Sequence, residues 1–275
     1  MIDDSRIFSE LRHAVLAVSY LAAKSGDSAG VLPPADAAAD DVDAERVAIA
    51  PQLLAARDFA YQPGSARAAH FDAADLQDVI CYVEALPGID GAGEPVARTA
   101  LHQVRLAADA RAQILHLECP GQAGDFEVFG GQMTLAMIAA IGQVSERSVR
   151  NAVSRGELKP SGGAVDDTYY RPEDAYGWLT GRRGFVPWPT ADQRRRRLHR
   201  TALQARNRKE FGRIVAEIAD EVRHRSKPAS FDAVRDGIFT ADINALRQVA
   251  EYTAAPDVAE FVGAAVTLAV RERAS

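Results

Sequence analysis

Apolar residues recur at helical spacing along most of this chain. Ile7, Leu11 and Val15 share one face if residues 4–24 form a helix, because residues four apart lie above one another on a helix surface. The same spacing predicts helices over Ala44–Asp58, Ala73–Leu86, Pro95–Glu118, Phe211 to about Arg225, Ala241–Tyr252 (capped by Thr240) and Asp257–Arg271. Pro33–Asp43, rich in proline, alanine and aspartate, is expected to be an exposed acidic loop. The pattern predicts a mainly α-helical protein.

Between Gln132 and Arg182 the pattern changes to short helices separated by glycines. Thr134 is expected to cap a helix over Leu135–Ile141, because its hydroxyl oxygen can accept from the free N–H groups of the first turn. Gly142 is expected to end this helix, since glycine tolerates the left-handed C-cap conformation. Val144 would then fill the turn as a buried apolar residue.

Ser145 is expected to cap a second short helix, which runs from Glu146 to about Arg155 and stops at Gly156. Val149 and Val153 are four apart and would face inward. The opposite face carries Arg147, Arg150, Asn151 and Ser154. Arginine can bind guanine through two hydrogen bonds and asparagine can do the same for adenine, so this face suits the major groove of DNA. Glu146 could accept from a cytosine amino group, or simply favour the positive helix N-terminus.

The residues after Gly156 predict a two-stranded wing followed by a third helix. Glu157–Pro160 and Thr168–Tyr170 would form the strands, with a glycine-rich loop that starts at Ser161–Gly163. Pro172 can occupy the first turn of the third helix. The residues expected on its inward face are Ala175, Trp178 and Leu179.

In order along the chain, these features resemble the winged-helix DNA-binding domains of the excisionase and MerR-like group. The matching patterns are T-L-x-x-I-A, G-x-V-S-x-R-S-V-R, R-G-E-L and Y-R-P-E-D-A-x-x-W-L, all within residues 132–182 of the 275-residue chain. The resemblance implies that the second helix enters the major groove while the wing meets the flanking backbone. It implies DNA contacts by Arg147, Arg150, Asn151 and Arg155, with Lys159 and Arg171 near the wing. The candidate interface is completed by Ser145, Glu146, Ser148, Ser154, Arg182 and Arg183. The wing loop departs from the pattern, because it carries the acids Asp166 and Asp167 where a DNA-contacting wing is usually basic.

Charge is unevenly distributed along the chain, whose net charge is −6. Residues 1–130 hold 9 Lys/Arg and 20 Asp/Glu (net −11), residues 131–227 hold 19 and 11 (net +8), and residues 228–275 hold 4 and 7 (net −3). Basic charge confined to one part of a chain is the pattern expected for contact with phosphates. Its densest part follows a predicted extended connector at 185–189 and comprises Arg194, Arg195, Arg196, Arg197 and Arg200. These arginines could grip the DNA backbone or form the solvated start of a long helix.

The sequence offers little support for other chemistry. Cys81 and Cys119 are far apart and lack CxxC spacing, so neither a zinc site nor a disulfide framework is predicted. His116, Glu118 and Cys119 are metal-ligand types, but we interpret them as incidental residues at a helix end. No metalloprotease, serine-hydrolase or dinucleotide-binding motif occurs, so we predict no catalytic residue, no metal and no cofactor. The apolar run Ala14–Ala23 is too short to span a bilayer and no basic leader precedes it, so a cytoplasmic protein is expected.

Together these patterns predict three domains: an acidic helical domain over 1–128, a winged helix-turn-helix over 129–188, and a basic, then helical region over 189–275. The expected function is sequence-specific binding of double-stranded DNA, most simply as a transcriptional regulator. A homodimer is expected, since one short reading helix gives limited specificity. Two alternatives remain open: a DNA-organising factor of a mobile element or plasmid, and an adaptor whose winged unit binds protein. The N-terminal domain could also bind an effector or a partner protein.

Overall fold

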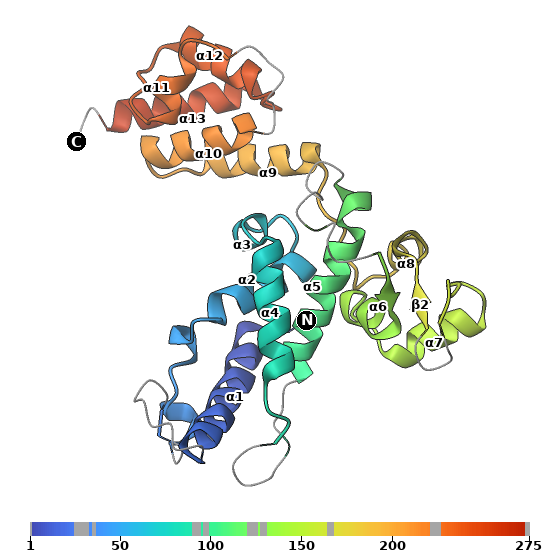
Figure 1. Cartoon of the computed structure of the whole chain (residues 1–275). Coiled ribbons are helices and arrows are strands. Elements are labelled where there is room, and N and C mark those ends of the chain that lie inside the picture. Colours follow the sequence, from blue (N-terminus) through green and yellow to red (C-terminus); the bar gives the residue numbers. More distant parts are fainter. Residues whose placement is uncertain are drawn as a thin grey trace. The chain divides into compact units, whose positions relative to one another are not determined.

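The computed structural model describes residues 2–24, 33–34, 37–89, 95, 99–119, 126, 131–163, 168–220 and 227–272. It is mainly helical with a small two-stranded sheet, which confirms the predicted fold class at that level (Figure 1). The chain divides into two compact units, Met1–Trp188 and Pro189–Ser275. None of the described helices combines the length and apolar content needed to cross a membrane.

The first half of the first unit is helical. Its elements are α1 Asp4–Lys24, the 3-10 turns η1 Ala39–Asp41 and η2 Ala44–Arg46, α2 Ala50–Tyr61, α3 Ala66–Ala69, α4 Ala73–Ala85 and α5 Thr99–Glu118. The bounds of α1 agree with the prediction, and those of α4 agree to one residue. The helix expected from Ala44 begins at Ala50 instead, because Pro51 lacks an N–H and suits a helical first turn. Pro95 is not helical but forms an isolated antiparallel bridge with Ile89. Nothing in the apolar spacing predicted α3, which is only four residues long.

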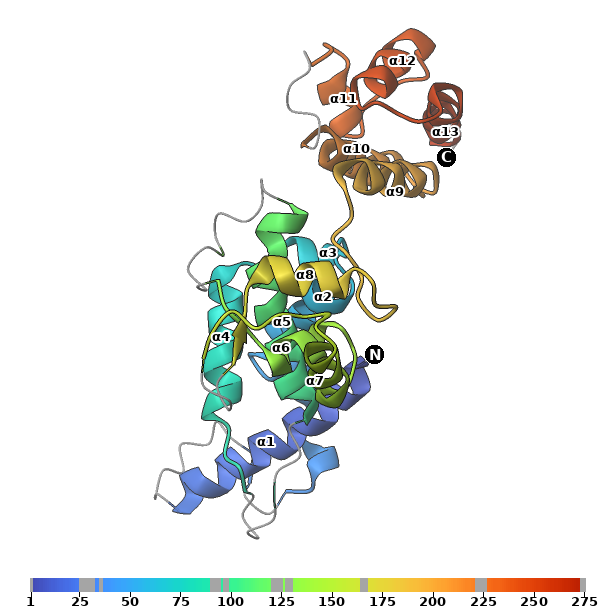
Figure 2. The same ribbon diagram turned by 90° about the vertical axis from the view of Figure 1, so that its right-hand side faces the viewer.

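Helix α5 is the central packing element of this unit. It contacts α1, α2 and α4 on one side and α6 and α8 on the other, and Figure 1 shows it between these groups. Figure 2 is viewed from the side of α6 and α8. Leu101, Val104 and Ile114 on α5 are fully buried. Several of its other buried positions are alanines, whose small side chains let neighbouring helices approach closely. The residues taken in the sequence as 1–128 and 129–188 therefore share one core.

Three short helices and the sheet follow α5. They are β1 Met133–Thr134, α6 Leu135–Ile141, α7 Glu146–Ser154, β2 Tyr169–Tyr170 and α8 Pro172–Leu179. The bounds of α6 and the start of α7 are those predicted, and the expected inward residues of α8 are all buried. The predicted pairing of the two wing strands is wrong. β2 pairs with β1, while its other edge bonds to Gly162 through Tyr169.

The strand expected at Glu157–Pro160 does not form, and the sequence contains the reason. Leu158 turns into the core and is 1% exposed, which draws this stretch away from β2. Pro160 has no N–H to donate to a neighbouring strand. The backbone bonds are made by the next residues, with Ser161 N donating to Tyr169 O (2.9 Å) and Tyr169 N to Gly162 O (3.1 Å). Asp166 and Asp167, the acids of the predicted wing tip, lie outside the described residues.

The segment expected to be an extended connector belongs to the first core. Phe185 and Trp188 are only 5% and 7% exposed. The Trp188 ring meets Phe59 of α2 edge-on, with ring centroids 5.6 Å apart. Two large aromatic side chains favour burial over exposure in a linker, and this burial fixes the end of the first unit.

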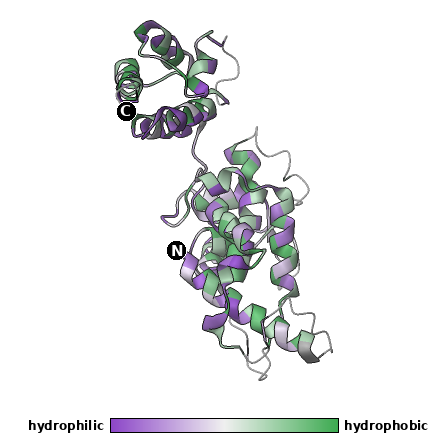
Figure 3. Ribbon diagram, turned by 90° about the vertical axis from the view of Figure 1, so that its left-hand side faces the viewer, coloured by the Kyte–Doolittle hydropathy of each residue, from purple (hydrophilic) through white to green (hydrophobic). Residues whose placement is uncertain are grey.

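The second unit is a helical bundle with its own core. Its elements are α9 Ala191–Leu203, α10 Arg208–Asp220, α11 Phe231–Arg235, α12 Ile243–Tyr252 and α13 Val258–Arg271. Phe211 and Phe261 lie at its centre, with ring centroids 5.1 Å apart. Asp242, rather than the expected Thr240, caps α12 by accepting from two backbone N–H groups. The predicted continuation of α10 to about Arg225 lies outside the described residues. Along the helices of both units green and purple segments alternate in Figure 3, as amphipathic helices require.

Candidate nucleic-acid interface

The turn between α6 and α7 is held by local hydrogen bonds that the sequence predicted. The Thr134 hydroxyl accepts from Met137 N at 3.2 Å, and the Ser145 hydroxyl accepts from Ser148 N at 3.2 Å. These caps satisfy backbone donors that a helix start leaves free.

The left-handed residue of the turn is not the glycine that the sequence predicted. Gly142 ends α6 in the right-handed region with φ −74°, and the left-handed residue is Gln143 with φ 51°. Gly142 serves packing, because a Cβ there would lie 3.0 Å from both Ile138 O and Leu179 Cδ2. Gln143 Nε2 also donates to the carbonyl oxygen of Gly184 at 2.6 Å, which ties the turn to the chain after α8.

Helix α7 has one buried face and one polar face. Val149 and Ala152 are fully buried, and Val153 is half-buried against the same core. All the polar residues predicted for its N-terminus and outer face are exposed: Ser145, Glu146, Arg147, Ser148, Arg150, Asn151 and Ser154. A short helix anchored by small apolar residues and lined outside by arginine, asparagine and serine has the shape and donors needed for base edges.

The two outer arginines of α7 differ in their electrostatic surroundings. Arg150 Nη2 pairs with Glu146 Oε2 at 2.8 Å, although both side chains remain largely exposed. Across the described parts of the chain, no acidic side chain pairs with Arg147. The Ser154 hydroxyl donates back to Arg150 O at 3.0 Å, so its own proton is already used. Arg147 and Asn151 therefore present the most available donors of this face.

Arg155 and Arg182, both predicted to contact DNA, converge on one carboxylate. Arg155 Nε lies 2.5 Å from Glu157 Oε1, and Arg182 Nη2 lies 2.9 Å from Glu157 Oε2. The hydrogen bond from Arg155, followed by that from Arg182, lowers the pKa of Glu157 to about 2. The Arg182 guanidinium also stacks over the Trp178 ring, 4.1 Å from its centroid. Arg155, Arg182 and Glu157 together carry a net charge of +1, and their ion pairs hold this charge at the C-terminal end of α7.

The remaining predicted basic residues of the first unit are exposed: Lys159, Arg171 and Arg183. Arg171 precedes α8, and its backbone N–H donates to the Ser161 hydroxyl at 3.1 Å. This contact joins the bridge segment beside β2 to the start of α8 and fixes the backbone from which the Arg171 side chain extends.

A buried ion pair connects this region to the rest of the first unit, and the sequence analysis missed it. Arg111 of α5 is fully buried, and its Nη1 lies 2.6 Å from Glu118 Oε2. Arg111 Nη2 donates to Ala60 O at 2.8 Å and to Val186 O at 2.6 Å. Glu118 Oε1 accepts from Trp188 N at 2.9 Å. The spacing of seven between the two residues on an expected helix was the available signal, since such residues lie on one face.

A second missed contact links α2 to α6. The Tyr61 hydroxyl lies at hydrogen-bond distance from Ala140 O (3.3 Å) and Gln103 O (3.4 Å). Burial raises the pKa of Tyr61 above its ordinary value, so this hydroxyl keeps its proton and remains a donor. The end of α2 thus supports both α5 and α6.

The arginine cluster predicted before the C-terminal helices lies on α9, in the second unit. Arg196, Arg197 and Arg200 are exposed, and Arg195 is half-buried. Arg194 is also half-buried and donates to Pro189 O at 3.0 Å. His199, between them, is buried with Nε2 3.0 Å from Thr253 O, and burial lowers its pKa. The cluster is therefore the exposed side of an amphipathic helix whose other side packs into the second core.

The metal-ligand types noted near the end of α5 make other contacts. His116 Nε2 lies 3.6 Å from Glu173 Oε1, while Glu118 pairs with Arg111. Within the described ranges, no group of three or more His, Cys, Asp or Glu residues could hold a metal ion. Cys81 and Cys119 are not joined in a disulfide.

No family model, curated protein or solved structure matches this chain. Its function is inferred from the geometry of α6–α8 and from the distribution of charge.

Proposed function

We propose that this protein binds double-stranded DNA sequence-specifically and acts as a transcriptional regulator in the cytoplasm. In this proposal residues 133–182 form a winged helix-turn-helix in which α7 enters the major groove. The observation that carries it is the outer face of α7, where Arg147, Arg150 and Asn151 project from a helix anchored by Val149 and Ala152. The proposal includes a homodimer, because paired half-sites supply the specificity that one helix lacks.

The local contacts support distinct roles for the basic side chains. Arg147 and Asn151 are suited to base edges, since their donors are available and bidentate contacts discriminate bases. Arg155 and Arg182, held by Glu157, are suited to backbone phosphate, which needs charge and position but no base pattern. The exposed arginines of α9 give the second unit a phosphate-binding face that is independent of sequence.

A selection from randomised duplex DNA tests this proposal. Full-length protein and the Arg147→Ala/Arg150→Ala variant would each be used to retain duplexes, which are then sequenced. The proposal expects a defined motif for the wild type and a lost or relaxed motif for the variant. Retention without a motif, equal in both proteins and abolished by salt, would assign binding to phosphate contacts outside α7's reading face, such as those of Arg155, Arg182 and the α9 arginines. No retention at low salt would reject DNA binding and favour the adaptor function.

The arrangement of the bound sites along genomic DNA distinguishes a transcriptional regulator from a DNA-organising factor. Mapping of retained genomic fragments would show single sites near promoters for a regulator. Clusters of repeated sites would instead support a mobile-element or plasmid-maintenance role.

A further inference from the structure

A cavity of about 410 Å³ opens among the first helices of the first unit. Its apolar lining comes from Phe8 of α1 and from Pro51 and Leu54 of α2. Three charged residues, Asp4, Glu45 and Arg67, also line it. The volume lies in the range of sites that hold small organic molecules, and the mixture of apolar walls with few charged groups is typical of them.

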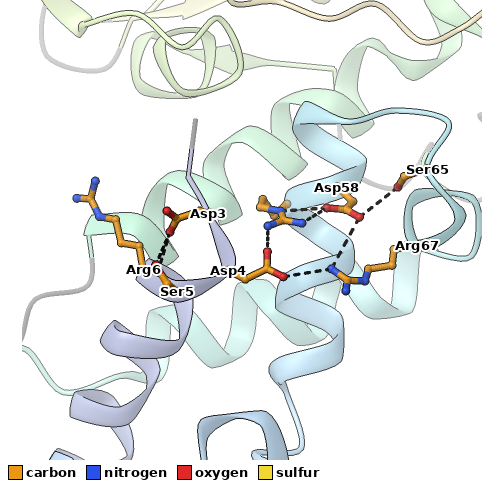
Figure 4. Close-up of polar contacts among 8 residues, drawn as sticks. Asp3, Asp4, Ser5, Arg6, Asp58, Ser65 and Arg67 are labelled. Carbon is orange, nitrogen blue, oxygen red and sulfur yellow. Dashed lines mark hydrogen bonds and ion pairs between the residues drawn. The ribbon is translucent and has the colours of Figure 1, made fainter. Parts of the chain in front are cut away.

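Two of the three charged lining residues, Asp4 and Arg67, form ion pairs. Asp4 pairs with Arg57, and its Oδ2 lies 3.6 Å from Arg67 Nη1. Arg57 also pairs with Asp58, whose Oδ2 accepts from the Ser65 hydroxyl at 3.2 Å (Figure 4). Two aspartates and two arginines thus balance one another in charge, and two of the four, Asp4 and Arg67, line the cavity.

Glu45 is the charged lining residue that takes no part in this network of ion pairs. It lines the cavity and is exposed, and within the described ranges its carboxylate makes no hydrogen bond or ion pair. The five charged side chains at the cavity, three acids and two arginines, carry a net charge of −1. An apolar pocket with one unmatched carboxylate favours a cation over an anion or a neutral molecule.

We propose that this cavity binds a small organic cation, an ammonium group attached to an apolar body. The ammonium meets Glu45, and the apolar body lies on Phe8, Pro51 and Leu54.

Helix α2 connects this site to the helices proposed to read DNA. Pro51 and Leu54 near its start line the cavity, while Ala60 and Tyr61 at its end hold Arg111 and the carbonyl of Ala140. A ligand that moves α2 would also move Tyr61, whose hydroxyl contacts the carbonyl oxygen of Ala140 in α6. This part of the proposal rests on the proposed function and makes the cation an effector of DNA binding.

Calorimetric titration of the full-length protein tests the site without DNA. The probes are 2-phenylethylammonium, cyclohexylammonium, and the neutral and anionic isosteres 2-phenylethanol and 3-phenylpropionate. We expect one site for the ammonium probes and affinities at least ~10-fold weaker for the isosteres, the size of a charge-assisted hydrogen bond. Glu45→Gln should weaken the ammonium probes by about 10-fold. The matched control Glu260→Gln, on α13, should leave them unchanged.

Three results would overturn the site: no binding of either ammonium probe, equal or tighter binding of the anion, or an unchanged affinity in Glu45→Gln. The effector role is tested separately by DNA affinity with and without saturating probe, with ammonium chloride matching the ionic strength. We expect a change in the wild type that Glu45→Gln lacks, and an unchanged affinity in both would reject the relay. Because the calorimetry involves no DNA, a failure of the proposed function leaves the test of the site intact.

Discussion

The basic side chains around α7 carry the same charge but are held differently. Arg147 projects without an acidic partner among the described residues, Arg150 is paired along the helix with Glu146, and Arg155 is bound to Glu157. A guanidinium with free donors can adapt to a base edge, whereas one fixed by a carboxylate offers mainly charge and position. The three arginines should therefore contribute differently to affinity and to specificity.

Replacement of Arg147 by alanine should reduce discrimination between the selected DNA site and a single-base mismatch by about 1–3 kcal/mol. Arg155→Ala should weaken both duplexes alike, because a phosphate contact carries no base information. Fluorescence anisotropy with matched and mismatched duplexes measures both effects. An equal loss of discrimination in the two variants would contradict these roles.

The pKa of Glu157 should depend on both of its arginine partners. Its pKa is lowered to about 2, with the hydrogen bond from Arg155 as the largest cause. A carboxylate with a lowered folded-state pKa stabilises the protein above its ordinary pKa, and that stability is lost as the pH falls toward 2. Arg155→Ala should raise the pKa of Glu157 more than Arg182→Ala does. Carboxyl ¹³C NMR titration of the two variants measures the order, and the reverse order would contradict this assignment.

At the scale of elements, α5 joins the N-terminal helices to the α6–α8 segment. Its Arg111–Glu118 pair is removed from water, with both side chains at most 1% exposed, and it binds carbonyls of two other segments. Loss of one member leaves a buried charge without its partner.

Arg111→Ala should accordingly lower the free energy of unfolding by about 3–5 kcal/mol. The double variant Arg111→Met/Glu118→Leu should lose much less, since no buried charge then remains unpaired. Arg105→Ala on the same helix, which breaks a more exposed pair with Glu84, should cost about 0–1 kcal/mol. Urea unfolding followed by tryptophan fluorescence gives all three values. A cost for Arg111→Ala no larger than for Arg105→Ala would show that the buried pair is dispensable.

The elements that could be predicted are those specified by neighbouring residues. Thr134, Ser145 and Gly156 fix α6 and α7 because a cap or a left-handed glycine acts within a few residues of itself. The partner of β2 could not be predicted in this way, because β1 precedes it by more than thirty positions and pairing depends on how α6 folds back. Arg111 was overlooked for the same reason, since its carbonyl partners come from distant segments.

At the scale of the whole molecule, the chain has two cores. Both tryptophans, Trp178 and Trp188, are buried in the first unit, while the second has its core at Phe211 and Phe261. The sequence placed a domain boundary near residue 189, where the two units meet along the chain. It did not predict that Phe185 and Trp188 are buried in the core of the first unit. An apolar run beside prolines suits either a linker or a buried terminus, and only the packing distinguishes the two.

The two cores should unfold separately. Phe211→Ala should destabilise the second unit by about 3–5 kcal/mol and leave the tryptophan transition unchanged. Circular dichroism, which reports helices in both units, should then show an earlier transition that fluorescence does not. Coincident transitions by both probes in the variant would contradict independent folding of the units.

Recognition of DNA by α7 is tested most directly by the salt-dependent affinity for a selected duplex and for a scrambled one. It compares the wild type with Arg147→Ala/Arg150→Ala and with Arg46→Ala/Arg247→Ala, a control with the same change in net charge. We expect the first variant to lose the preference for the selected duplex, while the control keeps it and changes affinity only slightly. Equal behaviour of the two variants, or no wild-type binding at low salt, would contradict recognition of DNA by α7.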